Sequence, residues 1–169
     1  ILGQFDFIRA RARLAMEMDG QMPDIEVRAG VHLVKAHHPL LLLYNKTSGK
    51  ATVPLDITLN EEHRILVISG PNAGGKTVAM KTIGLIQLMA QSGLLVPVAP
   101  GSRLGVFKQL MIQIGDAQSL EFELSTYSSH LVHMKEFLEA ANGRTLFFID
   151  EMGSGSDPDL GGRSEEHHV

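Results

Sequence analysis

The sequence contains no cysteine, and this absence excludes disulfides, thiolate metal ligands and cysteine nucleophiles. No stretch approaches the roughly 18 consecutive apolar residues that a membrane helix needs. Residues 1–4 include neither an initiator methionine nor the basic region of a signal peptide. We therefore expect a reducing, cytoplasmic location without a membrane partner, and we interpret the start of the sequence as a cut inside a longer protein.

An excess of positive charge is also missing. Against 15 lysines and arginines stand 19 aspartates and glutamates, which gives a net charge of −4, so the overall charge does not favour binding to a phosphate backbone. If the protein meets DNA, we expect another segment to hold it. A chain of 169 residues with 44% hydrophobic content can bury one core, which predicts one domain with at most an appendage.

Residues 5–18 alternate apolar and charged side chains at near-helical spacing and include no glycine or proline, which predicts an amphipathic helix. Its arginines are expected on a solvated face rather than on nucleic acid. At the other end, residues 163–169 break a glycine-rich pattern and resemble a vector-derived, tag-like tail. We expect residues 1–22 to form an appendage, 23–162 the main domain and 163–169 this tail.

Residues 25–59 break into short strand-like pieces, such as the alternating run 51–53. Glycines and prolines punctuate these pieces. The apolar run 39–44 is too short for a helix of its own, and we expect it to pack under the strands. The segment therefore predicts a small antiparallel β lobe.

A strand, a glycine loop and a helix follow in that order. Residues 64–69 form a continuous apolar run rich in β-branched side chains, as expected of a strand that is buried on both faces of a parallel sheet. Residues 77–91 carry a broad apolar stripe, and Gly93 stands at the expected C-cap. The order predicts a β-α unit with a tight loop between its strand and its helix.

A second strand is expected at residues 145–150, after a turn at Asn142 and Gly143 and a helix over residues 128–141. Ser128 or Ser129 is available to cap that helix. The fold class predicted from these elements is α/β, with a mainly parallel sheet flanked by helices and the small antiparallel lobe before the glycine loop.

The glycine loop matches G-x-x-x-x-G-K-[ST] in full. Backbone N–H groups of such a loop surround a β-phosphate at a helix N-terminus, which predicts a P-loop for ATP. Lys76 would reach the β and γ oxygens, and the Thr77 hydroxyl would bind Mg²⁺. An ordinary glycine turn is disfavoured by the flanking strand and helix. The predicted nucleotide-binding residues here are Gly70, Pro71, Asn72, Ala73, Gly74, Gly75, Lys76 and Thr77.

Two acids end the second predicted strand. Asp150 lies where ligands of open α/β sheets bind and would hold Mg²⁺ directly or through water, together with Thr77. Glu151 would orient and deprotonate the attacking water, so Glu151 and Lys76 are the predicted catalytic residues. The alternative for Glu151 is a surface carboxylate at the end of a strand.

Other nucleotide-binding classes fit less well. The guanine-reading motif of GTPases is approximated only by residues 45–48, which lack its aspartate and precede the glycine loop. A transporter ATPase would carry a Leu-Ser-Gly-Gly-Gln-like signature, and the sequence has none.

Four segments in order resemble the MutS family of ABC-type ATPases. They are the loop at 70–77, Ile-Gly-Asp-Ala-Gln-Ser at 114–119, Ser-Thr-Tyr-Ser-Ser-His at 125–130 and the acidic, glycine-rich stretch at 150–158. Ser-Ser-His and the later Asp-Pro are similar to the type-two branch, and His38-Pro39 resembles a His-Pro element of the family. The likeness covers most of residues 5–162.

The resemblance implies an ABC-type P-loop fold and a composite ATP site. Ser125 and Thr126 would act as the signature that contacts the γ-phosphate bound by the other subunit of a homodimer, although without the resemblance they would serve as a plain helix cap. Gln118 or Asp116 would sense the γ-phosphate and the metal. Residues 153–157 would form a loop at the dimer interface, for which a simple turn is the alternative.

For the N-terminal half, the resemblance implies that residues 1–22 are the remnant of a lever helix. It also places the adenine ring near Val53. His38 is expected to be a structural hydrogen-bonding residue more readily than a ligand.

The resemblance further implies an ATP hydrolase whose parent protein acts on branched DNA to suppress homologous recombination, or on stalled ribosomes, with a nuclease-like domain elsewhere. The isolated fragment is expected to be weak or inactive. The alternatives are a non-hydrolysing, nucleotide-dependent scaffold module and mismatch-repair MutS.

Overall fold

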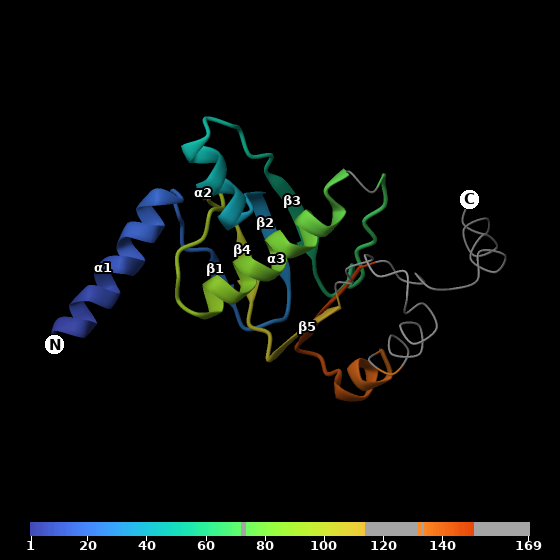
Figure 1. Ribbon diagram of the computed structural model, residues 1–169. Coiled ribbons are helices and arrows are strands. Elements are labelled where there is room, and N and C mark those ends of the chain that lie inside the picture. Colours follow the sequence, from blue (N-terminus) through green and yellow to red (C-terminus); the bar gives the residue numbers. More distant parts are fainter. Residues whose placement is uncertain (72–73, 114–131, 133, 151–169) are drawn as a thin grey trace. The chain divides into compact units, whose positions relative to one another are not determined.

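The computed structural model describes residues 1–71, 74–113, 132 and 134–150. The chain divides into two compact units, Ile1–Lys108 and Gln109–Val169, which are described in turn (Figure 1). No helix among the described residues is both long and apolar enough to cross a membrane.

The first unit contains three helices and a mixed four-stranded sheet. Its helices are α1 (Leu2–Glu17), α2 (Pro39–Thr47) and α3 (Lys76–Gln91), and its strands are β1 (Asp24–Glu26), β2 (Val31–Ala36), β3 (Leu55–Leu59) and β4 (Arg103–Gly105). The strand order is β1-β4-β2-β3. β1 runs parallel to β4, whereas β2 runs antiparallel to both β4 and β3. The predicted antiparallel lobe is therefore present, with one parallel pair at its edge.

The core of this unit lies between the sheet and α3. β2 alternates buried and less buried positions, as expected of a strand with one face on a core. A Cβ on Gly105 would lie 2.2 Å from the carbonyl oxygen of Arg28 and 2.6 Å from the amide nitrogen of Gly30, so only glycine fits at the end of β4. The buried apolar residues are Met18, Val31, Leu33, Ala36, Ile83, Ile86, Ala90, Val96, Val98, Leu104 and Phe107.

The expectation that run 39–44 forms no helix is wrong, because α2 spans Pro39–Thr47. The His38 side chain caps it by accepting a hydrogen bond from the Leu41 amide at 3.3 Å. Pro39 occupies the first turn, where its missing N–H costs nothing. A good start and three further polar residues extend the short apolar run into nine helical residues.

The predicted strand at residues 64–69 is also wrong. The segment has no assigned strand, and Ile65 and Val67 are 84% and 82% exposed. A strand needs a hydrogen-bonded neighbour, and no strand described in the first unit pairs with this segment. The described sheets are a mixed sheet and a parallel pair, so the α/β class is confirmed but a mainly parallel sheet is not shown.

Smaller differences concern boundaries. α1 begins at Leu2 rather than at residue 5, and α3 begins at Lys76. Residues 51–53 are not a strand, because pairing starts only after Pro54. The C-cap of α3 is Ser92, and Gly93, with φ +73°, stands one residue beyond it.

In the second unit, β5 (Gln109–Gln113) pairs in parallel with β6 (Thr145–Ile149). The strand β6 was predicted and β5 was not. Residues 134–140 are helical, and Phe137 packs on Phe147 with ring centroids 5.8 Å apart. The predicted turn is present, since the Thr145 amide donates to the Asn142 carbonyl at 3.0 Å. The predicted start of the preceding helix lies outside the described residues.

Candidate functional site

The glycine loop leads directly into α3. Gly75 is the N-cap residue, with φ +84°, and makes no side-chain cap. Glycine adopts such a backbone angle at little cost. A Cβ at this position would contact no other atom. Glycine is therefore favoured here by the backbone angle and not by a lack of space for a side chain. Gly74 closes a tight turn through a hydrogen bond from its amide to the Pro71 carbonyl at 2.8 Å. The loop therefore leads into the N-terminus of α3 through a glycine that makes no side-chain cap.

Lys76 is the first residue of α3, and its side chain folds back over the loop. Its Nζ donates to the carbonyl oxygen of Gly70 at 2.6 Å. Gly70 has φ +145°, another angle that favours glycine. Thr77 follows in the first turn and is half-buried. The structure thus brings the ammonium group of Lys76 to the start of the loop.

The helix behind the loop is firmly packed. Six of its residues are buried, Thr82, Ile83, Gly84, Ile86, Gln87 and Ala90. Gln87 Nε2 donates to the Gly105 carbonyl at 2.8 Å and to Gln91 Oε1 at 2.9 Å. Gln91 Oε1 also accepts from the Phe107 amide at 2.7 Å. This glutamine pair ties α3 to the end of β4. Sequence reasoning missed it, although two glutamines four residues apart on one helix can be recognised as a pair.

At the acidic end, Asp150 follows β6 in the second unit. Its amide donates to the Gln113 carbonyl at 2.9 Å, which continues the β5–β6 pairing by one residue. Asp150 is half-buried. Because β5 and β6 are parallel, the ends of both strands lie at one edge of this pair. The structure therefore places Asp150 at the carboxyl edge that the sequence predicted for it.

Several predicted residues lie outside the described part of the chain. They are Asn72, Ala73, Asp116, Gln118, Ser125, Thr126, Glu151 and the stretch 153–157.

His38, next to the first unit's sheet, has a structural role. Burial lowers the pKa of its imidazole below the ordinary value, and the charge of Lys81 acts in the same direction, while a backbone hydrogen bond partly opposes them. Because Nδ1 accepts from Leu41, we assign the neutral tautomer with its proton on Nε2.

Val53, the expected neighbour of adenine, is 88% exposed.

A family profile described as MutS domain V matches residues 66–162, which is more than half of the 169 residues. The chain belongs to the MutS domain V family. The matched range starts in the segment before the glycine loop and includes all four segments whose likeness to MutS was noted in the sequence, so the phosphate-loop motif and both acids fall within a single family match.

Three relatives of this MutS chain are named Endonuclease MutS2. The protein of Lactiplantibacillus plantarum is 45% identical over 161 residues, which cover 95% of this chain and 20% of that protein. The protein of Carboxydothermus hydrogenoformans is 45% identical over 158 residues, or 94% and 19%. That of Pelotomaculum thermopropionicum is 48% identical over 157 residues, or 93% and 19%. The MutS chain spans only 19–20% of the length of these relatives.

Proposed function

We propose that this MutS domain V chain binds ATP with Mg²⁺ and is the ATP-hydrolysing part of a larger protein. The observation that carries the proposal is the complete P-loop motif at residues 70–77, whose described part opens directly into a firmly packed helix. The positive end of a helix dipole and its N-terminal N–H groups favour an anion there. Gly75, the N-cap residue, makes no side-chain cap at that end.

Lys76 supplies the mobile positive charge of this site. One of its partners is a neutral carbonyl, that of Gly70. A phosphate oxygen is a stronger acceptor, because hydrogen bonds between two ionised groups are roughly twice as strong as neutral ones. We therefore propose that Lys76 exchanges the Gly70 carbonyl for the β and γ oxygens when nucleotide enters.

The donor set suits a hard cation. Thr77 offers a hydroxyl oxygen and Asp150 a carboxylate, which are ligands that Mg²⁺ prefers. The described residues contain no cluster of three or more histidines, aspartates or glutamates that could hold a metal by themselves. Bound there, Mg²⁺ would neutralise charge on the phosphate oxygens.

For hydrolysis, we propose that Glu151 accepts a proton from a water molecule while the oxygen of that water forms a bond to the γ-phosphorus. The bond from that phosphorus to the bridging oxygen breaks, and ADP and phosphate leave. Ser125 and Thr126 would complete the site of a second subunit in a homodimer, and Gln118 would sense the γ-phosphate. These roles rest on the resemblance to the MutS family.

The relatives are named endonucleases and are about five times as long as this chain. The activity of the whole protein is therefore a separate proposal. We propose a cytoplasmic protein that acts on branched DNA to suppress recombination, with stalled ribosomes as the second target. Residues 1–22 would be a lever remnant, 23–162 the ATPase domain and 163–169 a tail. A non-hydrolysing scaffold module is the competing function.

Two measurements test the proposal. In the 169-residue chain, titration with a fluorescent ATP analogue and Mg²⁺ should show binding that Lys76→Ala abolishes and Lys81→Ala preserves, since Lys81 lies exposed on the same helix. Equal binding by the Lys76→Ala variant would refute the site.

In the full-length protein, Glu151→Gln should abolish ATP turnover while ATP still binds. Unchanged turnover would favour the scaffold module. Recovery of DNA or of ribosomal RNA with the full-length protein from cells would decide between the two targets.

A further inference from the structure

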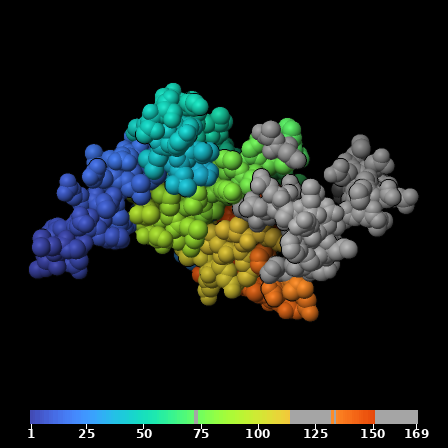
Figure 2. Space-filling view, in the orientation of Figure 1, coloured from blue at the N-terminus to red at the C-terminus, as the bar shows by residue number. Residues whose placement is uncertain are grey.

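The helix α1 is attached to the first unit at one end. None of its sixteen residues is buried, and it extends away from the sheet and the other helices (Figure 1). Figure 2 shows the same projection in space-filling form. Met18, directly after the helix, is only 2% exposed and enters the core. α1 is therefore anchored at its C-terminal end.

A short turn at this anchor determines where α1 points. Asp19 has φ +50°, a left-handed angle that is uncommon for residues other than glycine. A Cβ on Gly20 would lie 3.1 Å from Cβ of Leu95. The backbones of Gln21 and Val96 then exchange two hydrogen bonds, of 2.8 and 2.9 Å. On the helix side, the Gly20 amide donates to the Ala15 carbonyl at 2.8 Å. The turn therefore joins the C-terminal end of α1 to the sheet side of the first unit.

Two side chains also connect α1 to the rest of the first unit. The guanidinium of Arg11 donates to the Gly93 carbonyl, just beyond the end of α3. Lys46, in the last turn of α2, donates to the Glu17 carbonyl at 2.9 Å, at the end of α1. Each bond places a cation on the C-terminal end of another helix, where the negative end of the dipole and unpaired carbonyls favour it.

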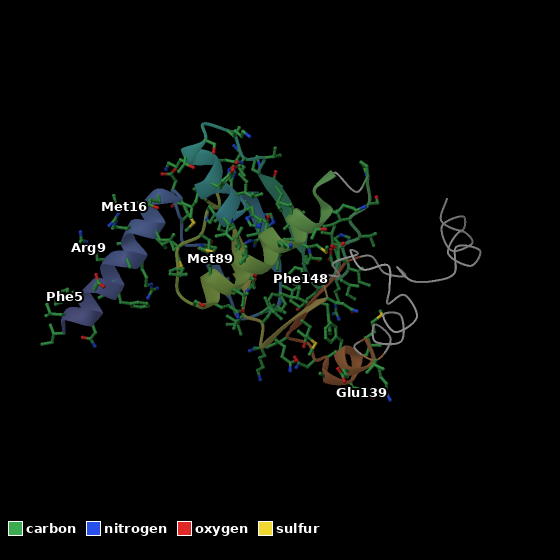
Figure 3. All side chains as sticks on the ribbon, viewed as in Figure 1. Phe5, Arg9, Met16, Met89, Glu139 and Phe148 are labelled. Carbon is green, nitrogen blue, oxygen red and sulfur yellow. The ribbon has the colours of Figure 1, made fainter. Side chains whose placement is uncertain are left out.

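Arg11 is further oriented by its own helix. The centre of its guanidinium lies 5.4 Å from the ring centroid of Phe7, one turn earlier, a cation–π distance. Arg9 and Arg13, its neighbours on α1, are exposed, and their side chains form no hydrogen bond or ion pair within the described part of the chain. Figure 3 labels Arg9 between Phe5 and Met16 on this helix. Of these three arginines, only Arg11 both stacks on Phe7 and donates to the Gly93 carbonyl in the described part of the chain.

We propose that Arg11 is a latch that sets the angle of α1 against α3, while the turn at residues 18–20 anchors the C-terminal end of α1. The latch binds the far end of the helix that starts at the glycine loop, so a shift of α3 along its axis displaces the carbonyl that Arg11 holds. Without the Arg11 bond, α1 is held at its C-terminal end by Met18, Lys46 and the turn, so its N-terminal part covers a wider range of positions. The latch is a property of the first unit and does not depend on nucleotide binding.

The experiment uses the absence of cysteine in the chain. Spin labels attached through Gln4→Cys on α1 and Lys81→Cys on α3, both exposed positions, report the inter-helix distance by double electron–electron resonance. The parent chain should give a narrow distribution. Arg11→Ala should broaden it roughly twofold, because one of few contacts that order α1 is lost. Arg13→Ala, the matched control, should leave the width unchanged, and Arg11→Lys should restore part of it.

Circular dichroism shows whether the variants keep their helix content. An Arg11→Ala chain that is folded and has the parent's distribution would overturn the latch. The same holds if Arg13→Ala broadens the distribution as much, because a general effect of charge would then explain the result.

Discussion

The helices α1 and α3 both span sixteen residues, yet one has no buried residue and the other has six. Neither begins with a side-chain cap. Isolated helices of this length are marginal in water, and most helical stability in proteins comes from packing. Two helices of equal length can therefore contribute very differently to the stability of the fold. The helix next to the glycine loop is the one that packing in the core stabilises.

The largest difference between α1 and α3 is expected when one isoleucine on each helix is replaced by alanine. Ile86 of α3 is fully buried, whereas Ile8 of α1 is 62% exposed. We expect Ile86→Ala to lower the free energy of unfolding by about 2–5 kcal/mol, and Ile8→Ala to change it by less than about 0.5 kcal/mol. Urea denaturation followed by circular dichroism measures both. Similar losses for the two variants would contradict the contrast.

A smaller effect is expected from the glutamine pair. Gln91→Ala removes the acceptor of the Phe107 amide and of Gln87 Nε2. A buried donor that loses its partner lowers the free energy of unfolding by about 1–3 kcal/mol, and the loss is smaller where water replaces the partner. Gln4→Ala on exposed α1 is the control. Loss of hydrogen-exchange protection at the Phe107 amide in Gln91→Ala, but not in Gln4→Ala, would locate the effect, and equal protection in both would refute it.

The smallest expected effect concerns α2, the one described helix of the first unit with a side-chain cap. Burial holds the pKa of His38 below its ordinary value, and Lys81 adds to this. The folded state therefore binds this proton less readily than the unfolded state. The associated stability is present above the unfolded pKa of about 6.5 and is lost as pH falls through it toward the folded pKa.

His38→Asn keeps a capping side chain that does not titrate. Between pH 7.5 and 5.5, we expect the parent chain to lose more unfolding free energy than this variant. The other histidines are common to both chains, so they largely cancel in the comparison. Parallel curves for the two chains would show that His38 does not contribute.

Local patterns predicted the elements that local chemistry determines. The helix after the glycine loop, the strand before Asp150 and the turn at Asn142 were all predicted, because periodicity, a glycine loop and an Asn-Gly pair specify them over a few residues. The helix α2 was missed, since its apolar run looks short until the cap of His38 and the proline at its start are counted together.

What the sequence could not predict depends on partners distant in the chain. Residues 64–69 have the composition of a buried strand, yet a ladder exists only where a neighbour supplies it. The pair β5–β6 joins residues 36 positions apart in register, Gln109 with Thr145. For the candidate site, the motif at 70–77 could be found from spacing alone. The fold-back of Lys76 onto Gly70 and the bonds of the glutamine pair to Gly105 and Phe107 could not.

The extended segment before the glycine loop has a practical consequence. Ile65 and Val67 are largely exposed, and within the described residues the backbone from 65 to 69 forms no hydrogen bond. An exposed apolar segment with unpaired backbone groups is a template for pairing between chains. The 169-residue chain should therefore self-associate as its concentration rises, and a charged residue at position 65 or 67 should improve its solubility.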